Sequence, residues 1–420
     1  MLDIKFIREN PDLVKESIRK KGDVDCIDDI LKLDERRREI LQKVEVLKNR
    51  RNVVSAEIGK LKKDGKDASS AIAEMEDVKN QIKVLDDELR QVEESLNKLL
   101  LQVPNIPHPT VPVGKTSADN VVISKWGEPP FIDFKPKPHW EIGERLDIVD
   151  FERGVKITGT GFPVFKDKGA KLERALINFF LDDASAKGYK EISPPLMVNS
   201  ASATGTGQLP DKEDLMYVVT KDDLYLVPTA EVPVTNMFRD EILDEKQLPI
   251  KYCAYTPCFR REAGSYGKDV RGLNRVHQFD KVELVKFVHP RETYNELEGM
   301  REDAESLLQK LGLHYRVLLM CTGDMGFTQA KKYDLEVWSI GQQKWLEVSS
   351  ISNFEAFQAR RMNIRFRSAG SKPEFVHTLN GSGLALPRVV AALLEHYQTP
   401  EGKVVIPKVL HKYTGFEVIG

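Results

Sequence analysis

Residues 75–99 read MEDVKNQIKVLDDELRQVEESLNKL, and their apolar side chains alternate three and four positions apart without a break. This spacing places one narrow apolar stripe along a helix, which is typical of a coiled coil. Residues 33–61 carry a similar repeat, and the polar, glycine-containing segment 62–70 separates the two. Because two such helices can bury their stripes by folding back on each other, the sequence predicts an antiparallel helical hairpin. At 1.5 Å per residue it would be roughly 45–50 Å long.

The two repeats carry an excess of opposite charges. Residues 33–66 hold eleven Lys and Arg against six Asp and Glu, whereas residues 67–102 hold nine acidic and four basic residues. We expect partial pairing between the helices and a remaining cationic face on the first helix, formed by Arg36, Arg37, Arg38, Arg50 and Arg51. Such a face suits a phosphate backbone, although a solvated helix face, a spacer or a dimerisation coiled coil also explains the pattern.

The composition is that of a globular protein with an ample core, since the 420 residues are 41% apolar and 30% charged. The net charge of −2 means that any nucleic-acid binding rests on local patches. No apolar run approaches the ~20 residues of a membrane span, and residues 1–6 lack the features of a signal peptide. The four cysteines are scattered, which favours reduced thiols. We therefore expect a cytoplasmic protein with no membrane partner.

A proline-rich segment interrupts the chain after the hairpin. Four prolines within residues 104–112 cannot continue a helix and favour an extended path. We expect three parts: a helical arm at 1–103, a linker at 104–124 and a second domain at 125–420. In the second domain short β-rich runs alternate with helical ones, which predicts an α+β fold with a mainly antiparallel sheet flanked by helices. No phosphate-binding GxxxxGK[ST] or GxGxxG pattern follows a strand.

One strand–loop–strand segment of the second domain concentrates functional side chains. The strands are expected at 252–259 and 276–288, and the first ends in Phe259-Arg260-Arg261-Glu262. The connecting loop is expected to be flexible and cationic through Gly264, Gly267, Gly272, Lys268, Arg271 and Arg275. Arginine presents a fork of donors to carboxylate and phosphate oxygens, Phe279 can stack on a purine, and Glu283 can hold an ammonium group. In isolation such a hairpin is also typical of a solvated surface.

Three further segments could hold ligands. Thr229-Ala230-Glu231 follows a strand and is equally explained as a turn with a helix cap. Glu347 can bind a cation, although a lone carboxylate is usually not a metal ligand. Residues 375–379 are predicted to form a strand that turns through Asn380-Gly381-Ser382-Gly383 into a helix. Arg388 near the start of that helix opposes the helix dipole, which indicates an anionic or aromatic ligand.

Together, and in this order, the segments resemble the three sequence motifs of the class II aminoacyl-tRNA synthetases. The first covers Gly188 to Pro195, the second Phe259 to Phe279, and the third Gly383 to Arg388. Within that class the details are similar to the seryl-tRNA synthetase family, in Thr229-Ala230-Glu231, Phe259 to Gly267, His277 to Glu283, Glu347 to Ser350 and Phe357 to Arg361. The N-terminal hairpin matches as well, and in that family it grips the long variable arm of serine tRNA. The resemblance spans essentially the whole chain.

The resemblance implies an ATP-dependent ligase with a class II synthetase core behind the helical arm. The reaction would activate L-serine to seryl-adenylate and transfer serine to serine tRNA, with ATP as substrate and Mg²⁺ as cofactor. The resemblance also implies a homodimer whose interface uses residues 172–196. Whether selenocysteine tRNA is a second acceptor stays open. One alternative is a class II paralogue that loads an amino acid onto a non-tRNA acceptor, which would lack the hairpin. Another is a catalytically inactive tRNA-binding protein, which would not need the intact motifs.

The resemblance further implies roles for individual residues. Arg260 would bridge the serine carboxylate and the α-phosphate, Glu262 would read the adenine, and Arg388 would stack on its ring; these three form the catalytic set. The implied serine-binding residues are Thr229, Ala230, Glu231, Glu283, Asn380 and Ser382. The further ATP-binding residues would be Arg261, Arg275, Val276, Phe279, Glu347, Val348, Ser349 and Ser350. Mg²⁺ would bind Glu347 and Ser350, and tRNA would bind Arg36, Arg37, Arg50 and Arg51.

Overall fold

The computed structural model describes residues 1–262 and 271–420, which divide into two compact units. The hairpin unit consists of residues 2–19 and 23–104, and the sheet unit of the remainder. Some of the residues predicted to make the connecting loop flexible and cationic lie outside the described residues, namely Gly264, Gly267 and Lys268.

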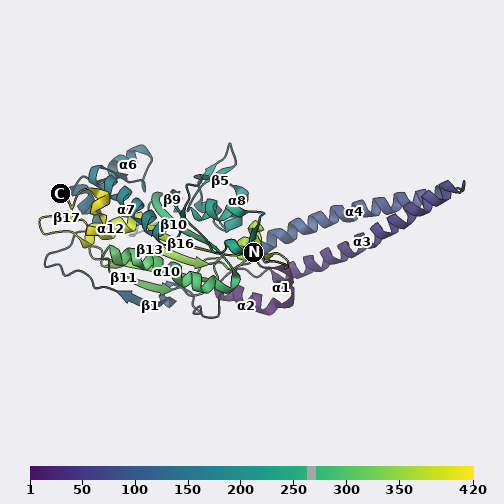
Figure 1. Cartoon of the computed structure of the whole chain (residues 1–420), viewed down its shortest axis with the longest axis horizontal. Coiled ribbons are helices and arrows are strands. Elements are labelled where there is room, and N and C mark those ends of the chain that lie inside the picture. Colours follow the sequence, from purple (N-terminus) through teal and green to yellow (C-terminus); the bar gives the residue numbers. More distant parts are fainter. Residues whose placement is uncertain (263–270) are drawn as a thin grey trace. The chain divides into compact units, whose positions relative to one another are not determined.

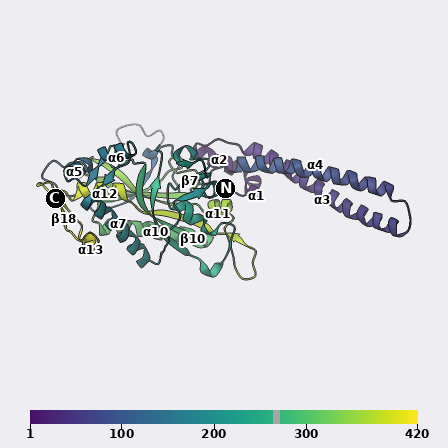
Figure 2. The ribbon, with the colours of Figure 1, turned by 90° about the horizontal axis from the view of Figure 1, so that it is seen from above.

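Two long helices of the hairpin unit run side by side in opposite directions (Figure 1, Figure 2). They are α3 (Ile27–Lys63) and α4 (Ser69–Leu100), and the short helices α1 (Ile4–Glu9) and α2 (Pro11–Lys21) precede them. The buried apolar stripe of α3 and α4 includes Ile40, Val44, Val54, Val78, Ile82 and Leu96. The predicted antiparallel hairpin is confirmed. Its first helix has 37 residues, or about 55 Å, because it begins several residues earlier than the heptad pattern indicated.

Ion pairs between the two long helices neutralise arginines that were expected to form a cationic face on the arm. Basic residues of α3 meet acidic residues of α4 in the pairs Arg36–Glu88, Arg37–Glu93 and Arg50–Glu74. Arg38 instead pairs within α3, with Asp34 at 3.1 Å. The expected partial pairing is confirmed, but it extends to four of the five arginines that were expected to remain as a cationic face, because acids of α4 and of the preceding helical turn lie within reach. The three pairs between the helices are partly exposed, and pairs of this kind contribute only about 0–1 kcal/mol, so a phosphate can compete for their guanidinium groups.

The sheet unit is built on one eight-stranded sheet within the described residues. Its neighbouring strands are antiparallel except for the pair β4–β9, which confirms the predicted α+β fold. In spatial order the strands are β1 (Val121–Trp126), β11 (Tyr315–Leu319), β12 (Lys331–Ser339), β13 (Lys344–Asn353), β16 (His377–Ala385), β10 (Gln278–Val288), β9 (Ile250–Phe259) and β4 (Lys190–Glu191).

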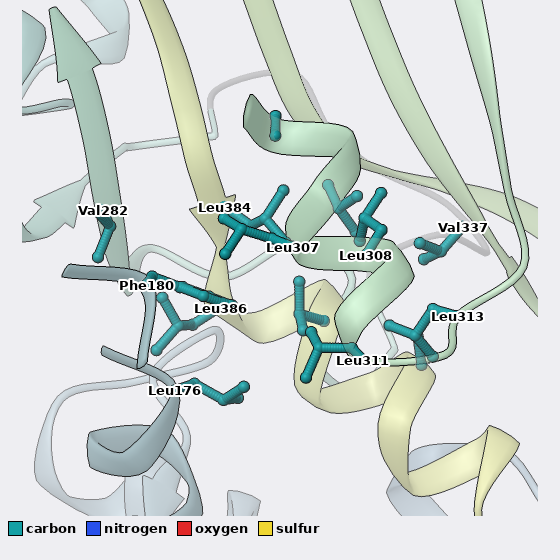
Figure 3. Packing of buried hydrophobic residues seen from close by; sticks show 14 of the residues in the cluster. Leu176, Phe180, Val282, Leu307, Leu308, Leu311, Leu313, Val337, Leu384 and Leu386 are labelled. Atoms are coloured by element: carbon teal, nitrogen blue, oxygen red, sulfur yellow. The ribbon is translucent and has the colours of Figure 1, made fainter. Parts of the chain in front are cut away.

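Three helices cover one face of this sheet and form the main core: α7 (Asp167–Ala186), α10 (Thr293–Lys310) and α12 (Leu386–His396). Figure 3 shows Phe180 of α7 and Leu307 of α10 close to Leu384 of β16. These side chains are fully or almost fully buried, and each contributes about 1.5–3 kcal/mol by leaving water. Because side chains alternate along a strand, the residues between the core positions point to the opposite face.

The remaining elements are short and surround the sheet. The helices are α5 (His139–Arg145), α6 (Phe151–Ile157), α8 (Ser200–Thr206), α9 (Glu231–Thr235), α11 (Phe357–Met362) and α13 (His411–Thr414). The strands are β2 (Val149–Asp150), β3 (Val164–Phe165), β5 (Met197–Asn199), β6 (Val218–Val219), β7 (Leu224–Leu226), β8 (Ile242–Asp244), β14 (Arg365–Arg367), β15 (Glu374–Phe375), β17 (Val404–Val405) and β18 (Val418–Ile419). Across residues 1–262 and 271–420, no helix has the length and apolar character needed to cross a membrane.

The stretch 104–124, predicted to be a linker, packs largely onto the sheet unit. Asn105 is 3% exposed, and its side-chain amide donates hydrogen bonds to the carbonyls of Thr328 at 3.0 Å and Phe354 at 2.9 Å. The end of the stretch enters strand β1, which pairs with β11 from Val121 onward. The prolines keep this segment extended, and its polar groups find partners on the sheet unit instead of in water.

Candidate active site

A cavity of about 530 Å³ lies over the face of the sheet opposite the main core. Strand β10 explains which side chains enter it. Phe279, Lys281 and Glu283 line the cavity, whereas Val282 and Leu284 between and beside them belong to the core cluster. This alternation follows from the two-residue period of a strand. The predicted purine-stacking and ammonium-binding residues of β10 are thus placed on one face.

Strand β16 continues through the segment that was predicted to be a turn. It pairs with β10 so that Ser382 lies opposite Glu283, and with β13 so that Asn380 lies opposite Ser352. The prediction of a turn at 380–383 was wrong because strand β16 runs through it, paired with β10 as far as Ser382 and with β13 as far as Gly381. As a result Asn380 and Ser382, two positions apart, both line the cavity.

A β-bulge in β13 brings Glu347 and Ser350 to the cavity. Residues three apart in a regular strand point to opposite faces, but the pairing with β12 shifts by one residue at Val348. Both Glu347 and Ser350 consequently line the cavity, together with Val348 and Ser349. The Ser349 hydroxyl donates a 2.6 Å hydrogen bond to the carbonyl of Ser382, which ties β13 to β16 at this level.

Glu347 and Ser350 fit a magnesium ion by their chemistry. The Glu347 side chain is 44% exposed and reachable from the cavity that it lines. Enclosure in the cavity raises the pKa of Glu347, but the positive charges of Lys332 and Arg388 outweigh this and hold the pKa below its ordinary value. An ionised carboxylate and a hydroxyl are hard oxygen ligands, and Mg²⁺ commonly takes one or two carboxylates beside substrate phosphates.

One part of the cavity is a buried polar pocket around Thr229, Glu231 and Glu283. Lys281 forms an ion pair with Glu283 and donates a 2.8 Å hydrogen bond to the Thr229 hydroxyl. Glu231 accepts a 2.7 Å hydrogen bond from Gln358 of α11. Burial, and then the nearby charge of Glu283, raise the pKa of Glu231 to about 6. Two carboxylates converge on this pocket, with Lys281 and Lys212 near Glu231, and carboxylate oxygens are the groups that can hold a cationic ligand such as an ammonium.

Another part of the cavity is rich in arginine. Arg275 pairs with Glu262 at 3.2 Å, and the Arg260 guanidinium lies 5.1 Å from the centre of the Phe279 ring. Arg388 donates a 2.8 Å hydrogen bond to the backbone carbonyl of Glu347. Cationic groups beside an aromatic ring suit a ligand that combines an anionic part with a flat ring.

Most of the predicted substrate residues line the cavity, with two exceptions. Ala230 is fully buried in a hydrophobic cluster with Val234 and is not among the lining residues. The Arg261 side chain is exposed and also does not line the cavity. The roles of the lining residues stay predictions. The four arginines predicted to bind tRNA belong to the hairpin unit.

The cavity contains polar residues to which the sequence analysis gave no role. Lys281 was identifiable in principle, because it sits between Phe279 and Glu283 in the period-two pattern of β10. Lys332 was not, because only the register of β12, which pairs it with Ser352, brings it to the cavity. The other unassigned lining residues include Gln208, Lys212, Asn274, Asp324 and Gln329.

Comparisons with known proteins agree with this arrangement. Residues 1–107 match the seryl-tRNA synthetase N-terminal domain, and residues 217–397 match the class II tRNA synthetase core domain (G, H, P, S and T). The serine–tRNA ligase of Salinibacter ruber is 56% identical, and that of Desulfitobacterium hafniense 55% identical; the matches cover 100% of this chain and 99–100% of theirs.

Solved structures give the same result. The crystal structure of seryl-tRNA synthetase from Pyrococcus horikoshii complexed with ATP has a TM-score of 0.94 and 42% identity, and the match covers 100% of this chain and 99% of that one. The cytoplasmic serine–tRNA ligase from Naegleria fowleri in complex with AMP has a TM-score of 0.88 and 32% identity, with 100% and 98% covered. On the full-length identity, both domain matches and the shared fold, the chain belongs to the seryl-tRNA synthetase family.

Proposed function

We propose that this chain activates L-serine with ATP to form seryl-adenylate and then transfers serine to serine tRNA. The observation that carries the proposal is the division of one cavity into a carboxylate-lined pocket and an arginine-rich part. Family membership supports it independently, because the full-length relatives are serine–tRNA ligases. The comparisons give no support to the alternative of a paralogue with a non-tRNA acceptor.

The first half-reaction needs positioning more than proton transfer. A serine carboxylate oxygen attacks the α-phosphorus of ATP, a new phosphorus–oxygen bond forms, and the bond to the β-phosphate oxygen breaks to release pyrophosphate. The carboxylate is already ionised near neutral pH, so no general base is required. In the second half-reaction a hydroxyl of the tRNA attacks the acyl carbon, the bond from that carbon to the phosphate oxygen breaks, AMP leaves, and the hydroxyl proton passes to solvent. Catalysis therefore rests on orientation and on neutralising phosphate charge.

The arginine-rich part would bind the nucleotide. Arg260 would bridge the serine carboxylate and the α-phosphate, and Arg275 would meet the outer phosphates. The adenine ring would stack between Phe279 and Arg388, and Glu262 would accept hydrogen bonds from its amino group. Mg²⁺ would be held by Glu347 and Ser350, and when bound it would offset the negative charge of the phosphates.

The buried polar pocket would bind serine and reject its analogues. Glu231 and Glu283 would hold the ammonium group, and Ser382, near Asn380, would hydrogen-bond the hydroxyl. Alanine and glycine would leave that polar group unpaired, which costs about 1–3 kcal/mol per buried group. Threonine carries the hydroxyl, so its extra methyl must be excluded by the size of the pocket, a weaker discrimination.

The helical arm would bind the tRNA through its basic residues, among them Arg36, Arg37, Arg50 and Arg51. These side chains keep part of their surface exposed although three of them pair with acids of α4. We also propose that the protein acts as a cytoplasmic homodimer, as the family resemblance implies. A monomer in light scattering would contradict the homodimer.

The experiment for the first half-reaction is amino-acid-dependent exchange of labelled pyrophosphate into ATP, with Mg²⁺ present. Serine should support exchange, threonine should support it weakly, and alanine and glycine at least tenfold less than serine. Exchange with another amino acid in preference to serine would overturn the assignment of the pocket.

A further inference from the structure

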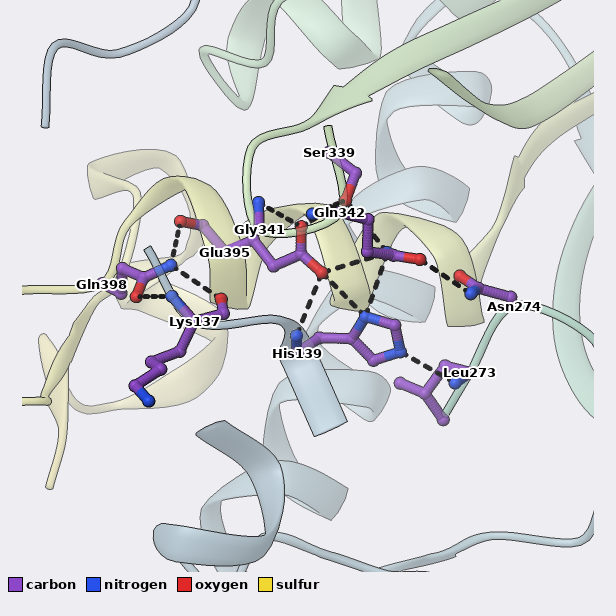
Figure 4. Close-up of polar contacts among 9 residues, drawn as sticks. All are labelled: Lys137, His139, Leu273, Asn274, Ser339, Gly341, Gln342, Glu395 and Gln398. Atoms are coloured by element: carbon purple, nitrogen blue, oxygen red, sulfur yellow. Dashed lines mark hydrogen bonds and ion pairs between the residues drawn. The ribbon is translucent and has the colours of Figure 1, made fainter. Parts of the chain in front are cut away.

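The start of helix α5 forms a platform for the loop limb that leads into β10. We define this return limb as residues 271–274, which directly precede Arg275. Its backbone N–H at Leu273 donates a 2.8 Å hydrogen bond to Nε2 of the buried His139 (Figure 4). Arg271 lies two residues before Leu273, and its guanidinium is 4.9 Å from the centre of the ring of Trp140, the residue after His139, which is a cation–π distance. Two adjacent side chains of α5 thus contact the limb.

Gly272 allows this close approach. Its φ is +70°, and a Cβ atom there would lie 2.3 Å from Nε2 of His139 and 2.9 Å from Cε3 of Trp140. Any other residue would therefore have to push the limb away from the platform. From the sequence alone, Gly272 is expected to make the loop flexible. In the structure it is the position at which the limb touches α5, so that interpretation was wrong for this glycine.

The hydrogen bonds determine the tautomer of His139. A backbone N–H can only donate, so Nε2 must carry no proton and must accept from Leu273. Nδ1 then carries the proton and donates to Oε1 of Glu395 at 2.8 Å. The His139 backbone N–H donates to the same oxygen at 3.0 Å. Both ends of the ring are satisfied only in this one arrangement.

Glu395 of α12 accepts the hydrogen bonds that hold His139 in place. It is fully buried, and Ser339, Gly341 and Gln342 also donate hydrogen bonds to its carboxylate. Burial raises the pKa of Glu395, but the hydrogen bonds from the His139 ring, the Ser339 hydroxyl and the His139 backbone N–H outweigh it and hold the pKa below its ordinary value. The acceptor is thus an ionised carboxylate, which makes the bonds to it strong.

The same network reaches the proposed ATP site. The Asn274 side chain donates a 2.8 Å hydrogen bond to Gln342, and Arg388 donates a 3.0 Å hydrogen bond to the Asn274 carbonyl. The next residue, Arg275, lines the cavity and pairs with Glu262. Helix α12 therefore supports the limb twice, through Glu395 and His139 and through Arg388.

We propose that His139, held by Glu395, and Trp140 are positioning residues that dock the return limb and thereby aim Arg275 and Arg388 at the nucleotide. This rests on the proposed function, and it gives roles to residues that do not line the cavity. The contacts are to the nucleotide side of the cavity, so their loss should raise the KM for ATP and leave the KM for serine nearly unchanged.

Two substitutions of the histidine separate its two hydrogen bonds. In His139→Asn the side-chain amide can reach Glu395 but cannot reach Leu273. In His139→Gln the longer side chain places an oxygen near the position of Nε2, so Leu273 keeps an acceptor. We expect His139→Asn to raise the KM for ATP about three- to tenfold, the effect of one lost hydrogen bond. His139→Gln should recover most of this, and exchange of the Leu273 amide hydrogen should be faster only in His139→Asn.

Trp140 provides a second, independent pair of variants. Trp140→Phe keeps an aromatic face for Arg271, whereas Trp140→Leu removes it, so only the leucine variant should raise the KM for ATP. If His139→Asn fails to fold, the two Trp140 variants still test whether docking of the return limb lowers the KM for ATP. His314→Asn is the matched control, because His314 is similarly buried and bonds the Trp126 carbonyl at 2.9 Å but does not line the cavity. It should leave the KM for ATP unchanged.

Pyrophosphate exchange in wild type and variants is the readout. Equal rises in the KM for ATP and for serine, or a rise in His314→Asn as large as in His139→Asn, would overturn the positioning role. Unchanged KM values in both His139→Asn and Trp140→Leu would also overturn it. If wild type itself shows no serine-dependent exchange, the proposed function fails instead, so the two failures are distinguishable.

Discussion

The buried ion pair between Lys281 and Glu283 makes a quantitative prediction. The two side chains are only 6% and 2% exposed, and Lys281 also bonds the Thr229 hydroxyl. Lys281→Met removes the positive charge and leaves Glu283 buried beside Glu231, a second carboxylate. Breaking a buried pair in this way typically costs 3–5 kcal/mol, because a buried charge loses its partner. We expect a loss of about 3–5 kcal/mol in the free energy of unfolding near pH 7.

The measurement is chemical denaturation of wild type, Lys281→Met and the double variant Lys281→Met/Glu283→Gln. The double variant removes both charges and should recover part of the loss. Lys137→Met is the control, because Lys137 pairs with Glu141 at 59% and 45% exposure and should cost under about 1 kcal/mol. Equal losses for Lys281→Met and Lys137→Met, or no recovery in the double variant, would refute the reasoning that burial makes the loss of the partner of Glu283 costly.

Three other predictions follow from the site and the arm. Arg260→Ala should lower adenylate formation at least a hundredfold while a gel-shift assay still detects tRNA binding; equal loss of both would contradict its assignment. Burial raises the pKa of Glu231 to about 6 from an ordinary 4.5, so its contribution to stability is complete below about pH 4.5 and is lost as the pH rises through 6. Glu231→Gln should flatten stability in this window, and an unchanged pH profile would argue against the shift. Removing the charges of Arg36, Arg37, Arg50 and Arg51 should weaken tRNA charging at least tenfold and leave pyrophosphate exchange unchanged. Equal losses in both assays would refute the assignment of these four residues to tRNA binding.

The sequence was most informative where the pattern itself produces the structure. The heptads predicted the hairpin because a continuous apolar stripe has few other ways to be buried. The strand–loop–strand segment was found because its strands and charged residues are neighbours in sequence, and β9 and β10 pair directly. The functional assignments came from the family resemblance and not from composition or periodicity.

The sequence did not predict how strands that are distant in the chain pair with each other, or which distant side chains meet. The bulge at Val348, which turns Glu347 to the cavity, depends on how β13 pairs with β12. The extension of β16 through Asn380 depends on two neighbouring strands that are distant in sequence. The link from Glu395 through His139 to the return limb joins residues more than 100 positions apart. No local pattern records such contacts.

The most direct test of the central claim is transfer of labelled serine to total tRNA with ATP and Mg²⁺, followed by separate assays with serine tRNA and selenocysteine tRNA transcripts. The account predicts acid-precipitable serine on the serine tRNA, and the second transcript decides whether selenocysteine tRNA is also an acceptor. Serine trapped as adenylate, with none on either tRNA, would contradict the account and assign the same ATP chemistry to a different acceptor.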